Sequence, residues 1–259
     1  MTISPRIISV ANQKGGVGKT TTTINLGAAL AARGKKVLLI DLDPQGNAST
    51  GLGIEQKDRK VSTYDLILND MALEKVIIET GVPQLWITPA TTDLSSADLE
   101  LVSTARRVFL LRDALRSADA VALGFDYILI DCPPSLNLLT LNAMVASDSV
   151  LVPLQAEFFA LEGLSQLMLS VREVRETANP GLRIEGIVLT MYDRRNNLCH
   201  QVELDARENL QDLVFHTMIP RNVRLSEAPS YGLPVINYDP TSRGSVAYKA
   251  LAREISERA

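Results

Sequence analysis

The sequence predicts an α/β protein: a mostly parallel, twisted sheet with helices on both faces, folded as a single domain. Short β-branched runs alternate with longer helical patterns along all 259 residues, which is typical of such a sheet. Hydrophobic residues make up 46% of the chain, enough to build one large core. No internal repeat, low-complexity tract or Gly/Ser linker divides the sequence, so one domain over residues 1–259 is expected.

Runs of β-branched and other apolar residues are each predicted to form a strand. Continuous apolar runs, rather than alternating ones, indicate strands that are buried on both faces. The predicted strands are residues 7–11, 36–41, 85–89, 127–131, 149–153, 184–190 and 215–219.

Helical patterns fill the segments between these runs. Residues 20–33 are predicted to form the first helix, which ends before Gly34 because glycine is a favoured C-terminal cap. Residues 94–116 and 158–177 are predicted to form two longer helices that cover the core. Strand, loop, helix and strand in this order form a unit of the mononucleotide-binding type.

Charge and cysteine content exclude several classes of protein. A formal net charge of −4 gives no overall positive field, so any contact with nucleic acid must use a local patch. Cys132 and Cys199 are far apart and belong to no Cys-x-x-Cys motif, which argues against disulfides and zinc. No long uncharged apolar stretch and no signal-like start is present, so a soluble protein of the reducing cytoplasm is expected.

A glycine-rich segment lies between the first predicted strand and the first predicted helix. Its residues are Lys14, Gly15, Gly16, Val17, Gly18, Lys19, Thr20 and Thr21. Glycines let the backbone curl around phosphate oxygens, and a helix N-terminus binds anions. Counting back from Gly18, the place of the first glycine in an ordinary P-loop holds Gln13, and Lys14 is an additional lysine. The segment is a deviant P-loop, which predicts a P-loop NTPase-like fold and ATP binding.

Lys19 and Thr20 hold the positions that act on phosphate and metal in P-loop proteins. Lys19 is expected to neutralise the β and γ phosphates, and the Thr20 hydroxyl to bind Mg²⁺. Carboxylates that follow two other strands face the same crevice. Among them, Asp131 is predicted to act in the outer magnesium shell and Asp43 to orient the attacking water. For Asp41, a structural carboxylate hydrogen-bonded to loop backbone and a magnesium ligand are equally supported.

Four stretches of the sequence carry a specific resemblance. They are ANQKGGVGKTT (11–21), DLDPQGN (41–47), IDCPP (130–134) and IPRNVRLSEAP (219–229). With them the chain closely resembles the ParA/Soj family of chromosome- and plasmid-partitioning ATPases. This family belongs to the deviant Walker group, which also includes MinD and the nitrogenase iron protein. The P-loop indicates only the group, whereas the last stretch points to ParA/Soj.

The resemblance implies an ATP-dependent homodimer. Lys14 would reach across the interface to the partner's phosphates, and Gly15 would keep the interface close. Two facing copies of the loop would repel each other without nucleotides between them, so dimerisation should require ATP. By the same resemblance the catalytic residues are Lys14, Lys19 and Asp43, and residues 131–134 form a switch.

The resemblance further implies that the dimer binds double-stranded DNA without sequence preference, on the nucleoid. A ParB-type centromere-binding protein would stimulate its slow ATP hydrolysis. DNA contacts of the family match Arg195 and Arg224, although exposed arginines of an acidic protein are usually only solvated. Other basic residues that could extend the patch are Arg194, Arg221, Arg243 and Lys249. Met191 and Pro220 are candidate apolar walls for adenine, although a methionine at a strand end is more often core.

The main alternative is a MinD-like ATPase that positions division proteins on a membrane. Such proteins end in an amphipathic membrane-targeting helix. Residues 248–259 carry two glutamates and little apolar area, so this segment is predicted to pack Leu251 and Ile255 onto the sheet instead. We therefore expect no membrane partner.

Two further alternatives have less support. A cluster-bearing protein of the nitrogenase iron type needs two suitably placed exposed cysteines, and neither Cys132 nor Cys199 has such surroundings. An ATP-dependent amide or carbon ligase needs a further catalytic set, and His200 and His216 are more often structural residues. Because the P-loop begins near the start of the chain, no N-terminal helix-turn-helix domain is expected. The sequence does not decide whether the protein serves a chromosome, a plasmid or another cargo.

Overall fold

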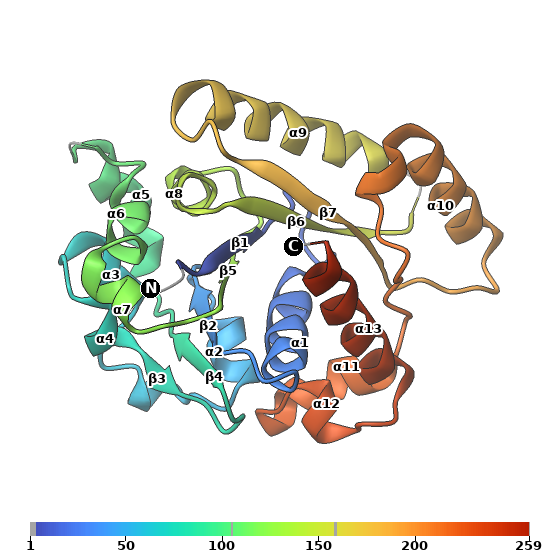
Figure 1. Ribbon diagram of the computed structural model, residues 1–259, viewed down its shortest axis with the longest axis horizontal. Coiled ribbons are helices and arrows are strands. Elements are labelled where there is room, and N and C mark those ends of the chain that lie inside the picture. The colour runs from blue at the N-terminus through green and yellow to red at the C-terminus, as the bar shows by residue number, and fades with distance from the viewer. Residues whose placement is uncertain (1–3, 105, 158–159, 259) are drawn as a thin grey trace.

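A computed structural model describes residues 4–104, 106–157 and 160–258. Within these residues one seven-stranded sheet has the order β3-β4-β2-β5-β1-β6-β7 (Figure 1). The strands are β1 (Arg6–Val10), β2 (Val37–Asp41), β3 (Ile78–Glu79), β4 (Leu85–Thr88), β5 (Tyr127–Asp131), β6 (Ser149–Gln155) and β7 (Arg183–Thr190). Edge strand β3 runs antiparallel to β4, and the other pairs are parallel. The predicted mostly parallel sheet is confirmed.

Helices cover both faces of this sheet, as predicted. On one face lie α1 and α13, and on the other lie α8 and α9 (Figure 1). The helices are α1 (Lys19–Ala31), α2 (Asn47–Gly51), α3 (Thr63–Leu68), α4 (Leu73–Val76), α5 (Leu94–Val102), α6 (Leu110–Leu115), α7 (Ala118–Ala122), α8 (Leu138–Ala146), α9 (Ala160–Thr177), α10 (Asn197–Leu210), α11 (Val223–Glu227), α12 (Val235–Tyr238) and α13 (Arg243–Glu257).

The central strands are mostly apolar, and both of their faces are buried. On β2, Leu38 and Ile40 join the core under α8 and α9, whereas Val37 and Leu39 join the core under α1. Each side chain of this kind stabilises the fold by roughly 1.5–3 kcal/mol on burial. The same two-sided burial explains why continuous apolar runs predicted these strands correctly.

The first and last helices lie together on one face. Helix α1 ends at Ala31, and Gly34 follows with a left-handed φ of 81°, close to the predicted cap. Helix α13 packs against α1 and buries Leu251 and Ile255 completely, as predicted. Helix α9 matches the predicted helix over 158–177, although residues 158 and 159 lie outside the described residues.

Residues 215–219 do not form a strand, so this prediction is wrong. Phe215 and Ile219 donate their N–H groups to β7, at the carbonyls of Ile187 (2.9 Å) and Leu189 (2.8 Å). The N–H groups between them, at residues 216 and 217, instead donate to the Glu254 carboxylate, at 2.8 and 3.0 Å. The segment lies beside the sheet edge, but a side chain of α13 takes the hydrogen bonds that a further strand would use.

The long helix predicted over residues 94–116 is also wrong, because it is divided into α5 and α6. Arg106 lies between them with a left-handed φ of 58°. Asn142 of α8 fills the break: its amide donates to the Arg107 carbonyl at 2.7 Å and accepts from the Leu111 N–H at 3.3 Å. A side chain distant in sequence thus satisfies backbone groups that a continuous helix would pair internally.

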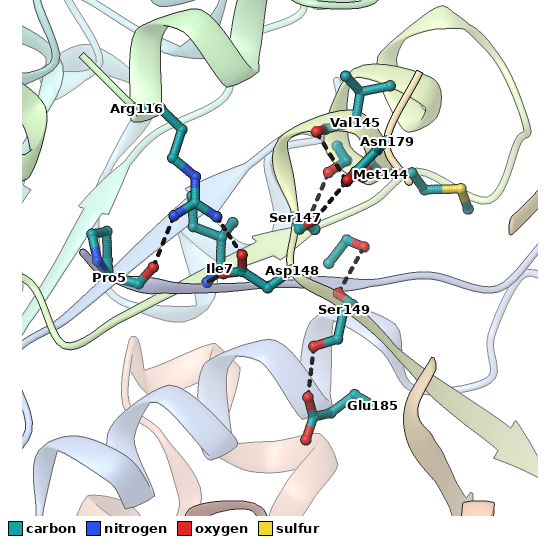
Figure 2. Close-up of polar contacts among 12 residues, drawn as sticks. Pro5, Ile7, Arg116, Met144, Val145, Ser147, Asp148, Ser149, Asn179 and Glu185 are labelled. Atoms are coloured by element: carbon teal, nitrogen blue, oxygen red, sulfur yellow. Dashed lines mark hydrogen bonds and ion pairs between the residues drawn. The ribbon is translucent and has the colours of Figure 1, made fainter. Parts of the chain in front are cut away.

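Polar contacts connect the N-terminal ends of neighbouring parallel strands (Figure 2). Arg116 donates to the Pro5 carbonyl at 3.2 Å and to Asp148 at 2.6 Å. Glu185 of β7 accepts a hydrogen bond from the Ser149 hydroxyl at 2.6 Å. Both of its carboxylate oxygens also accept from the Arg6 guanidinium, at 2.7 and 2.8 Å. These contacts join β1, β6 and β7 at the edge opposite the P-loop.

Candidate nucleotide-binding site

The P-loop connects the end of β1 to the start of α1. Gly16 and Gly18 have φ values of 77° and 88°, in the left-handed region that favours glycine. Gly18 is also the residue immediately before α1, so the loop ends at a helix N-terminus. The Val17 carbonyl accepts the Thr190 hydroxyl at 2.8 Å, which fixes the loop to the end of β7. This backbone has the shape of an anion-binding loop.

Lys19 points back across the loop. Its side chain is almost fully buried, and its Nζ donates to the Lys14 carbonyl at 3.0 Å. Burial lowers the pKa of Lys19, and the nearby Asp131 carboxylate opposes that shift. A buried lysine inside a loop of backbone N–H groups is suited to bind phosphate oxygens.

Lys14 and Gly15 face outward instead. The Lys14 ammonium forms an ion pair with Glu157, which follows β6, and both side chains are partly exposed. A Cβ added to Gly15 would meet no atom within 4 Å. The two lysines of the loop therefore have separate surroundings, one inside the phosphate loop and one on its outer surface.

Asp131 lies at the carboxyl end of β5, directly between Val10 of β1 and Asp41 of β2. It is fully buried, and its Oδ1 accepts the Thr23 hydroxyl at 3.2 Å. Its Oδ2 is buried without a hydrogen-bond donor among the described residues. Burial, with a further contribution from Asp41, raises the pKa of Asp131 to about 8. The Thr20 hydroxyl lies close enough to Asp131 to oppose this rise in pKa, so this hydroxyl and the buried carboxylate fit a cation such as Mg²⁺.

Asp41 makes the hydrogen bonds of a structural carboxylate, which is one of the two interpretations that the sequence supports. Its Oδ2 accepts the N–H of Ser49 at 2.8 Å and the hydroxyl of Ser49 at 2.6 Å, and it is fully buried. Burial raises the pKa of Asp41 to about 6, and the Ser49 hydrogen bonds oppose the shift. The carboxylate thereby holds the start of α2.

Asp43 follows β2 in a tight turn. Its Oδ1 accepts the Gln45 N–H at 3.0 Å, and its carbonyl accepts the Gly46 N–H at 2.9 Å. The carboxylate is half-buried and close enough to influence the charges of Lys19 and Asp131. Its place beside the P-loop is compatible with the predicted water-orienting role, which stays a prediction.

The predicted adenine residues lie near the loop. Met191 directly follows Thr190, which is bound to the P-loop, and has a left-handed φ of 51°. Pro220 lies next to Tyr192 through a parallel bridge. Both residues are partly buried. Their contact with adenine stays a prediction.

The predicted DNA-binding arginines lie in different surroundings. Arg195 borders an open groove of about 1240 Å³ together with Arg194, Arg221 and Arg243. It is highly exposed and pairs with Asp193 at 3.0 Å, which lowers the pKa of Asp193 to about 2.

Arg224 lies outside the residues that border this groove. It pairs with Glu227 at 2.7 Å and Asp239 at 3.3 Å. Lys249 donates to the Pro240 carbonyl at 3.2 Å and is likewise not among the groove residues. The structure therefore brings together four of the six basic residues of the predicted patch.

Several contacts of the site were missed in the sequence. The Thr23 hydroxyl donates to Asp131, and the Thr190 hydroxyl donates to the Val17 carbonyl. Glu157 forms an ion pair with Lys14. Asn12 accepts the Lys14 N–H at 3.0 Å through its side chain. The position of Thr23, four residues after Lys19 on the same helix face, was a usable signal. The partners of Thr190 and Glu157 depend on the fold alone.

The cysteines and histidines show no arrangement of a cluster or metal site. Cys132 and Cys199 are buried as free thiols, and burial raises the pKa of Cys132. Among the described residues, no group of three His, Cys, Asp or Glu side chains could hold a metal ion. In the same part of the chain, no helix is both long and apolar enough to cross a membrane.

Comparisons with known proteins agree with this geometry. The family described as AAA domain matches residues 5–184. The chromosome partitioning protein ParA of Caulobacter vibrioides is 56% identical over 253 residues, which are 98% of this chain and 94% of the relative. The sporulation initiation inhibitor protein Soj of Bacillus subtilis is 54% identical over 97% of this chain and 98% of its own.

Solved structures share the fold. The septum site-determining protein MinD of Pyrococcus horikoshii, complexed with Mg-ADP, has a TM-score of 0.80 and 29% identity over 98% of this chain and 97% of its own. A cobyrinic acid a,c-diamide synthase of Mycobacterium smegmatis, with bound ADP and magnesium, has a TM-score of 0.82 and 36% identity over 96% of this chain and 93% of its own. With a deviant P-loop, a MinD-like fold and full-length relatives at more than half identity, the chain belongs to the ParA/Soj family of chromosome-partitioning ATPases.

Proposed function

We propose that this protein is an ATP-driven dimerising switch that binds DNA without sequence preference and hydrolyses ATP in chromosome or plasmid segregation. The observation that carries the proposal is that the two lysines of the P-loop lie in different surroundings. Lys19 is buried and bound to the loop itself, whereas Lys14 lies on the outer surface beside the open space at Gly15. An outward lysine is suited to the phosphates of a second copy of the chain.

Magnesium and ATP fit the inner part of this site. Thr20 and Asp131 would hold Mg²⁺, which neutralises charge on the phosphate oxygens. Lys19 would bind the β and γ phosphates, and Asp43 would orient the attacking water. The buried Asp131 oxygen without a donor supports the metal assignment. The MinD and synthase structures with bound nucleotide and magnesium support the same ligands for this fold.

The arginine groove supports DNA as a partner of the dimer. Its arginines include Arg194, Arg221 and Arg243, none of which forms an ion pair within 4.0 Å among the described residues, although Arg221 adds to the effect of Arg195 on the pKa of Asp193. Guanidinium groups bind phosphate oxygens and need no base contact, so binding would not depend on sequence. A dimer presents this groove twice. A ParB-type protein, which the family resemblance implies, is the proposed partner that stimulates hydrolysis.

Two alternative functions, a MinD-like ATPase and an amide-forming ATPase, have support from the solved structures. The MinD structure supports the MinD-like alternative by fold, but the apolar side chains Leu251 and Ile255 of α13 are buried in the core. The synthase structure supports an amide-forming ATPase, but His200 and His216, the histidines that could serve a further catalytic set, are both exposed. The partitioning relatives are also more similar in sequence than the synthase, at 54–56% against 36% identity.

Replacement of Asp43 tests the proposal. Asp43→Ala should bind ATP normally but nearly stop hydrolysis, because the attacking water loses its acceptor while the P-loop is intact. Since ATP holds the dimer together, the variant should accumulate as a stable dimer in size-exclusion chromatography with ATP and Mg²⁺. Asp119→Ala, which removes an exposed carboxylate on α7, is the matched control. Normal hydrolysis by Asp43→Ala would remove Asp43 from the reaction.

A further inference from the structure

One guanidinium group outside the P-loop holds the turn that carries Asp43. Arg59 follows the short 3₁₀ helix Gln56–Asp58 and donates to two backbone carbonyls. Its Nε and Nη2 donate to the Ile54 carbonyl, at 3.2 and 2.8 Å, and its Nη1 donates to the Ala90 carbonyl at 3.1 Å. Nη2 also donates to the Thr50 hydroxyl at 2.7 Å. Arg59 therefore connects three separate segments.

The contact with Thr50 continues to Asp43. The Thr50 hydroxyl donates to the Gly46 carbonyl at 3.0 Å, and the Gly46 N–H donates to the Asp43 carbonyl at 2.9 Å. Gly46 has a φ of 62°, and a Cβ placed on it would lie 2.2 Å from Arg59 Nη1. The guanidinium thus lies directly against the backbone of the turn.

The opposite side of the turn has a second attachment. Ser49 donates its hydroxyl to Asp41 at 2.6 Å and accepts the Ala90 N–H at 3.1 Å. This attachment is buried in the core side of α2. Arg59 is the corresponding attachment on the solvent side.

On the solvent side of the turn, the described residues form an open groove and not a packed layer. There the turn borders an open groove of about 690 Å³, whose residues include Pro44, Gln45 and Arg59 itself. Where packing does not fix a backbone turn, hydrogen bonds to its carbonyls decide how far it can move.

We propose that Arg59 is a positioning residue for ATP hydrolysis, which keeps the Asp43 turn in place through Thr50 and Gly46. The proposal rests on the proposed function of Asp43 as the water-orienting residue. Arg59 does not belong to the P-loop and touches neither Lys19 nor Thr20, so it should affect hydrolysis and not ATP binding. A displacement of the order of 1 Å can lower a rate by roughly a hundredfold.

The experiment compares Arg59→Met, Arg59→Lys and Thr50→Val with a matched control, Lys60→Met. Lys60 is an exposed cation next to Arg59 in the sequence. We expect Arg59→Met to lower the single-turnover rate of ATP hydrolysis by about ten- to a hundredfold, with MgATP affinity unchanged within about twofold. Arg59→Lys should recover only part of the rate, because an ammonium cannot span three acceptors. The control should hydrolyse ATP like the original protein.

Thr50→Val keeps the shape of the side chain and removes only the hydroxyl between Arg59 and Gly46. It should reproduce most of the loss of rate. If thermal denaturation shows that Arg59→Met is destabilised, Thr50→Val still tests the proposal. Added methylguanidinium should raise the rate of an Arg59→Ala variant several-fold and leave Asp43→Ala unchanged. A merely structural role of Arg59 would not produce this selective recovery.

A double variant separates the two assignments. If Arg59 acts through Asp43, Arg59→Met should cause little further loss in an Asp43→Ala background. An equal fractional loss in both backgrounds, or a normal rate for Arg59→Met, would overturn the proposal for Arg59 and leave Asp43 in place. Normal hydrolysis by Asp43→Ala would overturn the role of Asp43, and the proposal for Arg59 with it.

Discussion

At the scale of single residues, the P-loop separates two lysines that the sequence places five positions apart. Lys19 donates back to the Lys14 carbonyl from inside the loop, whereas the Lys14 ammonium contacts Glu157 outside it. The motif alone was sufficient to predict the inner lysine, because its position before Thr20 is fixed by the chemistry of phosphate binding. The outer contact depends on where β6 ends, and no local pattern contains that information.

Gly15 provides a test of the outer surface. Gly15→Val should bind ATP normally, since the loop has open space at this position and Gly15 is not among the residues with left-handed φ. It should remain a monomer with a slowly hydrolysed ATP analogue in sedimentation velocity, because a branched side chain would separate two facing loops. Gly81→Val, at another open glycine, is the control. A variant that loses both ATP binding and dimerisation would show damage to the loop instead.

Glu157 provides a second residue-scale test. If Lys14 acts on the partner's phosphates, dimerisation must break its ion pair with Glu157 in both subunits. Partly exposed pairs stabilise by about 0.2–1 kcal/mol each, so Glu157→Gln should tighten the ATP-bound dimer by roughly two- to thirtyfold. Dimer dissociation constants from sedimentation equilibrium measure this, with Glu173→Gln of α9 as control. Weaker dimerisation would mean that Glu157 contributes to the interface.

At the scale of elements, the sequence was sufficient to predict the buried strands of the sheet. It was insufficient where a distant side chain binds backbone groups that a helix or strand would otherwise pair. Strands β1, β2, β5 and β6 are apolar because both faces are buried, so the prediction from their composition was correct. Strand β3 was missed, since its two residues are too few to form a pattern.

The wrong elements share one physical cause. Asn142 binds the backbone between α5 and α6, and Glu254 binds the backbone of residues 216 and 217. In each case a distant side chain takes hydrogen bonds that the local pattern assigns to a helix or a strand. Within the helix predicted over residues 94–116, Leu99 is apolar but 79% exposed, so its apolar character does not indicate a core position.

The attachment of β7 to β1 is an element-scale prediction of stability. Glu185 is almost fully buried, and it accepts from both Arg6 and Ser149. Glu185→Ala should lower the free energy of unfolding in urea by about 3–5 kcal/mol, because it leaves the Arg6 charge buried without a partner. Glu257→Ala, from the exposed pair with Arg253, should cost less than about 1 kcal/mol. Similar losses for both variants would show that the Arg6 guanidinium finds other partners.

At the scale of the whole molecule, the net charge of −4 opposes contact with DNA and the arrangement of the arginines favours it. Arg194, Arg195, Arg221 and Arg243 come from three regions of the sequence and border one groove. Their convergence could not be predicted from composition, because β7, residues 215–221 and the start of α13 meet only in the folded chain. The charge that matters is therefore local.

The DNA prediction follows from this local charge. Only the ATP-bound dimer should bind duplex DNA tightly, because dimerisation doubles the arginines on one surface and each phosphate contact releases counterions. If six to eight phosphates are contacted, the slope of log K against log salt should be roughly −5 to −7, independent of sequence. Fluorescence anisotropy with two unrelated duplexes at several salt concentrations measures both properties.

Charge reversals within the groove should change this slope. Arg195→Glu and Arg221→Glu should each weaken binding to all sequences and flatten the slope by about one unit or more per subunit, with ATP-dependent dimerisation unchanged. Arg224→Glu should have a smaller effect, because Arg224 does not border the groove and pairs with two carboxylates, Glu227 and Asp239, whereas Arg195 pairs with one. Arg172→Glu on α9 makes the same change of charge outside the groove and should bind normally. If the ATP dimer binds no DNA at physiological salt but sediments with anionic liposomes, the partitioning function is wrong and the membrane-positioning alternative replaces it.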